Sequence, residues 1–205
     1  MREDGEIPEQ LVEACKDNQT VKIIFASSLG SNYDVKTILD CVPLLEKAGL
    51  NFCIFIAGIG PLENFVKNSI RELSSKNIFY VGNPYSDELA RIYSHCDIGI
   101  SAYLPSSMVS LPIKAFHYTA AGLAIVNSLG GDFCQLLAES KSGIQYEAEN
   151  SQSLAGAIKW YCENPQVLID AKKASYNLGL NFDADLQYSK VSNLLKLLTI
   201  DKKLI

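Results

Sequence analysis

Lys114 and His117 offer the most useful chemistry in this sequence for an anionic, hydroxyl-bearing ligand. They are three positions apart in a segment of helical character, so they share one face of that helix. A lysine neutralises phosphate charge, and an imidazole hydrogen-bonds a sugar hydroxyl. Two alternatives stay open: a lysine early in a helix is commonly solvated, and His117, between Phe116 and Tyr118, also suits a structural role.

Two loops have a composition suited to an anion. The loop "SLGSNY" contains Gly30 and Ser31, which are small and turn-forming and whose amides can face a phosphate. The loop "YLPSSMVSLP" leads into a helix whose first turn we expect near Ser110 and Leu111. Free amides and the positive end of the helix dipole favour a phosphate at such a start.

The segment "VGNPY" places Asn83, Pro84 and Tyr85 after a predicted strand, where a planar base could stack or bond to the backbone; a plain turn is the alternative. The glycines of "AGIGP" and "SLGGD" are weaker signals, since neither belongs to a GxGxxG motif. A nicotinamide oxidoreductase is set aside because that motif and its acidic partner are missing. The sequence also has no P-loop and no convincing Ser/His/Asp set.

Short apolar runs alternate with amphipathic segments along the chain. Strands are expected at 21–27, 51–58, 77–82, 97–102, 123–128 and 143–147. Helices are expected at 34–48, from Leu62 to Leu73, from Ser86 (as N-cap) to Cys96, at 111–121, around Phe133 to Leu137, and at 151–163, 165–179 and 185–198. We expect Pro43 to kink or stop the first of these helices, and Asn164 with Pro165 to open the helix at 165–179.

This order predicts an α/β fold with a doubly wound, six-stranded parallel sheet and a helical carboxyl terminus. Residues 1–20 are expected to be a polar leader or linker with one loose helical turn at 8–16, and residues 21–200 a single domain. In a doubly wound sheet the ligand site lies where the strand order reverses, which here is between the first and fourth strands.

Composition excludes several classes of protein. The 205 residues are 48% hydrophobic with a net charge of −5, which excludes disorder as the main state. No Lys/Arg block indicates a nucleic-acid partner, and the longest apolar runs are too short to cross a bilayer. The acidic amino terminus has no export signal, and the six cysteines are dispersed without a CxxC motif. We therefore expect a cytoplasmic protein with reduced thiols.

The ordered segments "ASSLGSNYDVKTILD", "IFIAGIGP", "NIFYVGNPYSDELARIYSHCDIGIS", "SLPIKAFHYTAAGLAIVNSLGGD" and "SGIQYEAEN" resemble the carboxyl-terminal half of GT-B glycosyltransferases. The resemblance is to the retaining group-one family that builds bacterial polysaccharides, and it covers roughly residues 20–198. It implies a Rossmann-like domain that binds a nucleoside-diphosphate sugar for hexosyl transfer to a saccharide or lipid-linked acceptor.

The resemblance also implies roles for the candidate residues. The diphosphate is expected at Gly30, Ser31, Ser110, Leu111 and Lys114, with Lys114 also stabilising the leaving group, and the base at Asn83, Pro84 and Tyr85. His117 stands where many relatives carry the glutamate that binds the ribose, and Val109 replaces a second family glutamate. No metal or other cofactor is expected.

Such enzymes hold the acceptor on an amino-terminal domain, which this sequence does not contain. We therefore expect the chain to be either one half of such an enzyme, with the amino-terminal domain missing, or one subunit of a split enzyme. That domain or partner subunit would also supply any peripheral contact with a membrane. A non-catalytic nucleotide-sugar-binding or regulatory module with a decayed ribose site is the alternative, because of His117 and Val109.

Overall fold

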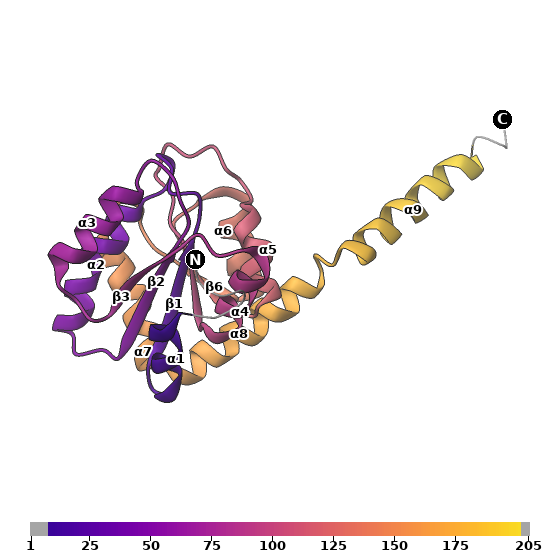
Figure 1. Ribbon diagram of the computed structural model, residues 1–205. Helices are drawn as coiled ribbons and strands as arrows, with labels where there is room; N and C mark the ends of the chain where they lie inside the picture. Colours follow the sequence, from indigo (N-terminus) through magenta and orange to yellow (C-terminus); the bar gives the residue numbers. More distant parts are fainter. Residues whose placement is uncertain (1–7, 202–205) are drawn as a thin grey trace.

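Six parallel strands form one sheet in the computed structural model, which describes residues 8–201 (Figure 1). The strands are β1 (Val21–Ala26), β2 (Phe52–Ala57), β3 (Ile78–Gly82), β4 (Ile98–Ser101), β5 (Ala124–Asn127) and β6 (Gly143–Gln145). Their order in the sheet is β3-β2-β1-β4-β5-β6, so the order reverses between β1 and β4. The predicted doubly wound parallel sheet is therefore confirmed.

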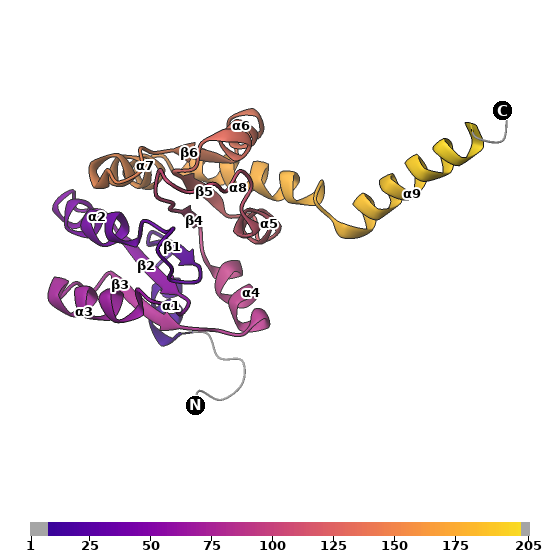
Figure 2. The same cartoon turned by 90° about the horizontal axis from the view of Figure 1, so that it is seen from above.

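The helices alternate with the strands and cover both faces of the sheet (Figure 2). They are α1 (Glu9–Lys16), α2 (Val35–Lys47), α3 (Glu63–Leu73), α4 (Ser86–His95), α5 (Ile113–Ala120), α6 (Gly131–Ser140), α7 (Ser151–Glu163), α8 (Pro165–Leu180) and α9 (Ala184–Asp201). Buried side chains of α2, α3 and α7 form the core on one face, and those of α1, α4, α5 and α6 form the core on the other.

The sequence of β1 explains why the sheet is buried on both sides. Ile23 and Phe25 belong to the core beneath α2 and α7, whereas Ile24 and Ala26 belong to the core beneath α4 and α5. Successive residues of a strand point to opposite faces, so only a continuous apolar run can supply both cores.

Two predicted helix starts were wrong. Helix α5 begins at Ile113, with Pro112 as its extended N-cap residue, so Ser110 and Leu111 precede the helix. The proline explains this, since the residue before a proline is disfavoured in helical conformation. Helix α4 begins at Ser86 itself, and Tyr85 is the N-cap residue, with no side-chain capping bond.

Pro43 does not stop α2, which continues to Lys47. A proline inside a helix removes one hydrogen bond, but here the flanking Val42 and Leu45 are buried in the core, which favours continuation. Asn164 is the N-cap residue of α8, with Pro165 first in that helix, as predicted. The Asn164 side chain, however, donates to the Trp160 carbonyl at the end of α7.

Strands β1 and β4 pair over a short ladder, Ile23 with Ile98 and Ile24 with Gly99, before the strands diverge. The Tyr118 hydroxyl of α5 occupies the resulting gap, where it accepts from the Ala26 amide at 3.1 Å and donates to the Ile100 carbonyl at 3.2 Å. Gly99 leaves room for the ring, because a Cβ there would lie 2.5 Å from it. The two hydrogen bonds of Tyr118 therefore hold α5 against both strands, at the point where β1 and β4 stop pairing.

The polar segment expected at 1–20 contains α1, whose Leu11 is fully buried on the α4 side of the sheet. The first seven residues, part of the acidic terminus discussed above, lie outside the described residues. At the other end of the chain, α9 points away from the sheet in both views (Figures 1 and 2).

Candidate functional site

A cavity of about 570 Å³ lies at the carboxyl ends of β1 to β4, at the edge where the strand order reverses. Its walls come from the loops that follow β1, β2, β3 and β4, from α4, and from the first turns of α5. This is where a doubly wound sheet binds ligands, because loops from strands on either side of the reversal leave a crevice.

The structure brings several of the predicted residues together in this cavity. Asn83 and Pro84 line it from the loop after β3, Leu111 lines it from the loop after β4, and Lys114 and His117 line it from α5. Lys114 and His117 face the same space, as their spacing predicts. His117 is exposed, and its ring lies 6.5 Å from that of Tyr93.

The remaining predicted residues lie outside the cavity lining. Gly30 and Ser31 belong to a tight turn, in which the Gly30 amide donates to the Ser28 carbonyl at 2.5 Å. The Ser110 hydroxyl is turned toward α6, where it donates to Asp132 at 2.7 Å. Tyr85 is 80% exposed.

The loops after β1 and β4 meet, but not at the residues that are predicted to hold the diphosphate. Tyr33 and Tyr103 form an isolated antiparallel bridge, and their rings are 4.8 Å apart. The Leu104 amide donates to the Asn32 carbonyl at 3.1 Å beside it. The contact thus involves the end of the first loop and the beginning of the second, rather than Gly30–Ser31 and Ser110–Leu111.

Lys114 is buried at the base of the cavity, with only 8% of the residue exposed. Its Nζ has no hydrogen-bond partner in the described part of the chain and lies over three rings, those of Phe25 (4.6 Å), Tyr33 (4.3 Å) and Tyr103 (4.8 Å). Burial lowers the pKa of Lys114 to about 7. A buried cation without an anionic partner is costly, so this site is poised to accept an anion.

Ser27 is a second buried polar group without a partner, and its hydroxyl also belongs to a residue that lines the cavity. It follows β1 directly and lies against the turn after β2, where Gly58 has a φ of +123°. A Cβ at Gly58 would lie 1.7 Å from the Ser27 carbonyl oxygen, so only glycine permits the two turns to touch.

Sequence reasoning missed Ser27, Tyr33 and Tyr103 as site residues. Ser27 had one available signal, since it is the first polar residue after the apolar run of β1. The two tyrosines are the last residue of one loop and the first residue of the other loop that composition did single out, but nothing in their spacing indicates that they meet across the sheet.

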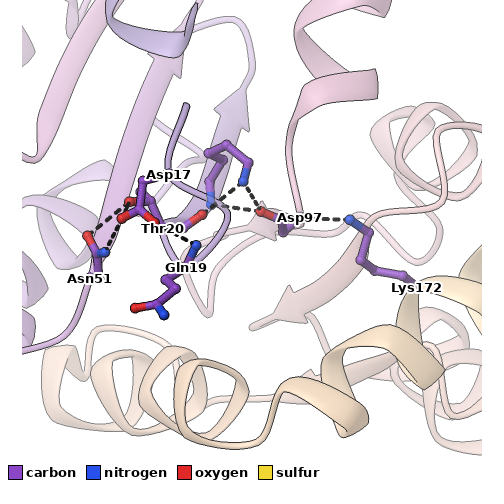
Figure 3. Close-up of polar contacts among 7 residues, drawn as sticks. Asp17, Gln19, Thr20, Asn51, Asp97 and Lys172 are labelled. Atoms are coloured by element: carbon purple, nitrogen blue, oxygen red, sulfur yellow. Dashed lines mark hydrogen bonds and ion pairs between the residues drawn. The ribbon is translucent and has the colours of Figure 1, made fainter. Parts of the chain in front are cut away.

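The opposite end of the sheet carries a polar cluster of a different kind (Figure 3). Asp97 accepts from Lys172 of α8 at 2.6 Å and lies 3.1 Å from the Lys22 Nζ. Burial alone would raise the pKa of Asp97, but the hydrogen bond and charge of Lys172, together with the Lys22 amide and ammonium, hold it below its ordinary value. All three groups are paired, which is typical of a structural link rather than a binding site.

The arrangement around Lys114 combines a Rossmann-like sheet with unpaired polar groups at its reversal point. The family described as Glycosyl transferases group 1 matches the chain over residues 7–178. The chain belongs to this family. The resemblance inferred from the ordered motifs is thereby confirmed.

Proteins similar to this group 1 chain match it at low sequence identity. The uncharacterized glycosyltransferase MJ1607 of Methanocaldococcus jannaschii is 24% identical over 152 residues, which are 67% of this chain and 38% of that protein. Anabaena HepE, solved in complex with UDP, superposes with a TM-score of 0.72 at 15% identity, covering 93% of this chain and 53% of HepE. The chain thus spans about half or less of these two proteins.

The carboxyl-terminal domain of the group 1 protein LpcC from Francisella tularensis superposes with a TM-score of 0.68 at 14% identity. That match covers 85% of this chain and 93% of the LpcC domain. The chain therefore has the fold of the carboxyl-terminal domain of a GT-B protein. Among the helices described, we find none with the length and apolar character needed to cross a membrane.

Proposed function

We propose that this chain is the donor-binding half of a glycosyltransferase. It would bind a nucleoside-diphosphate sugar for hexosyl transfer to a saccharide or lipid-linked acceptor. The observation that carries the proposal is Lys114, a buried and unpaired amine at the base of the cavity where the sheet order reverses. Membership of the group 1 family and the UDP complex of HepE support the choice of ligand.

In this proposal the diphosphate lies against Lys114 and the Ser27 hydroxyl, beneath the first amides of α5. The positive end of the α5 dipole adds to the charge of the lysine. Gly30, Ser31, Ser110 and Leu111 remain predicted diphosphate contacts; of these, Leu111 lines the cavity, and the other three would reach a donor only if their loops moved.

The base is proposed to lie at the loop after β3, against Asn83 and Pro84, which line the cavity next to α4. Tyr85, exposed at the same loop, would reach the base by turning its ring inward. His117 would donate to or accept from a hydroxyl of the ribose or the transferred sugar.

The catalytic contribution of Lys114 would be electrostatic. As the bond between the anomeric carbon and the phosphate oxygen breaks, negative charge develops on the departing diphosphate, and a buried ammonium stabilises it more strongly than water would. Because Lys114 supplies this charge, we propose that the reaction proceeds without a metal or another cofactor.

The acceptor is proposed to lie on an amino-terminal domain or a partner subunit. The cavity lining includes exposed apolar side chains: Ile59 is 50% exposed, Val109 36% and Ile113 73%. A lining of this kind suits coverage by another domain, and the chain spans only 53% of HepE. We propose a cytoplasmic location, because the six thiols of the chain are unpaired.

Isothermal titration of the full chain with UDP-sugars and GDP-sugars tests this function. We expect binding to the wild-type chain and binding at least tenfold weaker for Lys114→Gln, since a hydrogen bond to a charged group contributes roughly 1.5–3 kcal/mol. Lys67→Gln is the matched control, because Lys67 also lies over a ring but is paired with Glu63. Absence of binding to every donor, with and without an acceptor domain, would refute the proposal.

The second candidate is a nucleotide-sugar-binding or regulatory module without catalysis. It is favoured by the exposed His117 at the position of the family's ribose glutamate. The variant His117→Glu separates the two functions: tighter nucleotide binding indicates a decayed ribose site, whereas weaker binding shows that His117 is a working contact.

A further inference from the structure

The Nζ of Lys114 is surrounded by aromatic rings and, in the part of the chain that the structure describes, has no negatively charged group beside it. Its Nζ is buried without a hydrogen-bond partner, and its neighbours are the ring faces of Phe25, Tyr33 and Tyr103, all within 4.8 Å of the nitrogen. We call these three rings the aromatic cage. Ring faces attract a cation, but they cannot neutralise it as a carboxylate does.

The neighbouring elements supply no anion to Lys114. Asp34 follows Tyr33 in the same loop, but its carboxylate accepts from the amides of Thr37 (3.3 Å) and Glu149 (2.8 Å). In the described residues no carboxylate lies within ion-pair distance of Lys114.

The other titratable groups around the cage are neutral or belong to the cavity itself. Burial raises the pKa of Tyr103 from the β4 loop, of Tyr93 from α4 and of Tyr118 from α5, so these phenols stay protonated. His117 is one turn further along α5 and faces the cavity. Among the described residues Lys114 has no negatively charged neighbour, so an anion that enters the cavity would supply its counter-charge.

We propose that donor binding to this site takes up a proton: in the empty cavity, burial without a counter-charge holds a large share of Lys114 as the neutral amine, and an entering diphosphate makes it an ammonium. This inference rests on the proposed function, since it requires a diphosphate at Lys114. The proton comes from the solvent and adds to the lone pair of Nζ, and no bond of the donor breaks in this step.

The physical basis is the difference between the empty and the occupied cavity. Burial lowers the pKa of Lys114 to about 7, while attraction to the three rings acts in the opposite direction and favours the ammonium. A diphosphate in contact would return the pKa toward the ordinary lysine range. Between these two values, each unit of pH rise then costs up to about tenfold in donor affinity.

Titration calorimetry of the full chain measures the proton directly. UDP-glucose is the probe, or GDP-mannose if that is the donor that binds, because the diphosphate of a nucleotide sugar is doubly esterified and has no group that titrates near neutral pH. Binding enthalpies in two phosphate-free buffers whose ionisation enthalpies differ, HEPES and Tris at pH 8 and MES and Bis-Tris at pH 6, give the number of protons taken up. From a pKa of about 7, we expect about 0.9 proton per donor at pH 8 and about 0.1 at pH 6.

Three variants assign the proton to Lys114. Lys114→Arg keeps a permanent positive charge, so its binding should take up no proton at pH 8. His117→Gln removes the imidazole on this helix face and is expected to weaken donor binding, but the number of protons taken up per donor bound should stay the same. Lys67→Gln should also leave uptake unchanged, because Lys67 is paired with Glu63 outside the cavity.

The outcomes distinguish this inference from the function on which it rests. Donor binding with the same enthalpy in both buffers at pH 8 overturns the proton uptake and leaves the function intact. Uptake that survives in Lys114→Arg, or that disappears in His117→Gln, places the proton elsewhere and also overturns the inference. Failure of every donor to bind overturns the proposed function, and the inference with it.

Discussion

Replacing Gly58 by alanine should disrupt the floor of the cavity. Gly58 has a φ of +123°, a backbone conformation open almost only to glycine, and a Cβ would lie 1.7 Å from the Ser27 carbonyl oxygen. Backbone strain of this kind costs roughly 1–3 kcal/mol, and forcing an extra carbon into a packed contact costs roughly another 1–3 kcal/mol. We therefore expect Gly58→Ala to lower the free energy of unfolding by roughly 2–6 kcal/mol.

Urea denaturation followed by circular dichroism measures this loss, and calorimetry with the nucleotide sugar measures its effect on the cavity. Where Gly58→Ala remains folded, the two turns must separate, so Ser27 should move away and donor affinity should fall. Gly30→Ala is the matched control for stability. It lies in the turn after β1, has no φ in the left-handed region, and its nearest non-neighbouring atom would be 3.5 Å from the new Cβ.

The control should leave stability unchanged or raise it by about 0.4–1 kcal/mol, since alanine reduces the entropy of the unfolded chain. If Gly58→Ala unfolds at the same urea concentration as Gly30→Ala and the wild-type chain, the close contact between the two turns is refuted.

Three further changes test other parts of the fold. Tyr118→Phe should lower the free energy of unfolding by about 1–3 kcal/mol in urea titration, because it leaves the buried Ala26 amide unsatisfied; an unchanged midpoint contradicts that bond. Gly179→Ala should be strongly destabilising in thermal unfolding, because its Cβ would lie 2.7 Å from the Thr119 carbonyl group; unchanged melting would mean that α8 does not cross α5 closely. Asp97→Asn should destabilise the chain near neutral pH but not in acid. The pKa of Asp97 is lower in the folded than in the unfolded chain. The ionised carboxylate therefore adds to the free energy of unfolding above the unfolded pKa, about 3.9, and this contribution disappears as the pH falls through the folded pKa. Urea titrations at pH 7 and pH 3 measure this, and a loss equal at both values would exclude the charge as its cause.

The fold was predictable because its signals are local and repeated. The buried part of each strand in a parallel sheet covered on both faces must be apolar, as "IIFA" of β1 is, and amphipathic helices separate the strands. Helix starts were less predictable. Leu111 looked like part of α5 by composition, but Pro112 imposes an extended backbone before the helix.

The candidate site was predictable only in part, for a related reason. Lys114 and His117 share the cavity because helical periodicity fixes their relation. Gly30 and Ser31 lie outside the lining because composition marks a loop without giving its path. The cage tyrosines come from loops separated by about a third of the chain, and only the sheet order brings them together.

The Tyr118 hydroxyl between Ala26 and Ile100 determines which wall of the cavity can adapt. A shift of α5 relative to the sheet would break two buried hydrogen bonds at once. The positions of Lys114 and His117 relative to β1 and β4 are therefore fixed. The segment from Leu104 to Leu111, in which Met108 is almost wholly exposed, is the part of the cavity wall that can change its conformation. Donors of different size would therefore be accommodated by reshaping that stretch, while the position of the lysine relative to the strands stays constant from one ligand to the next.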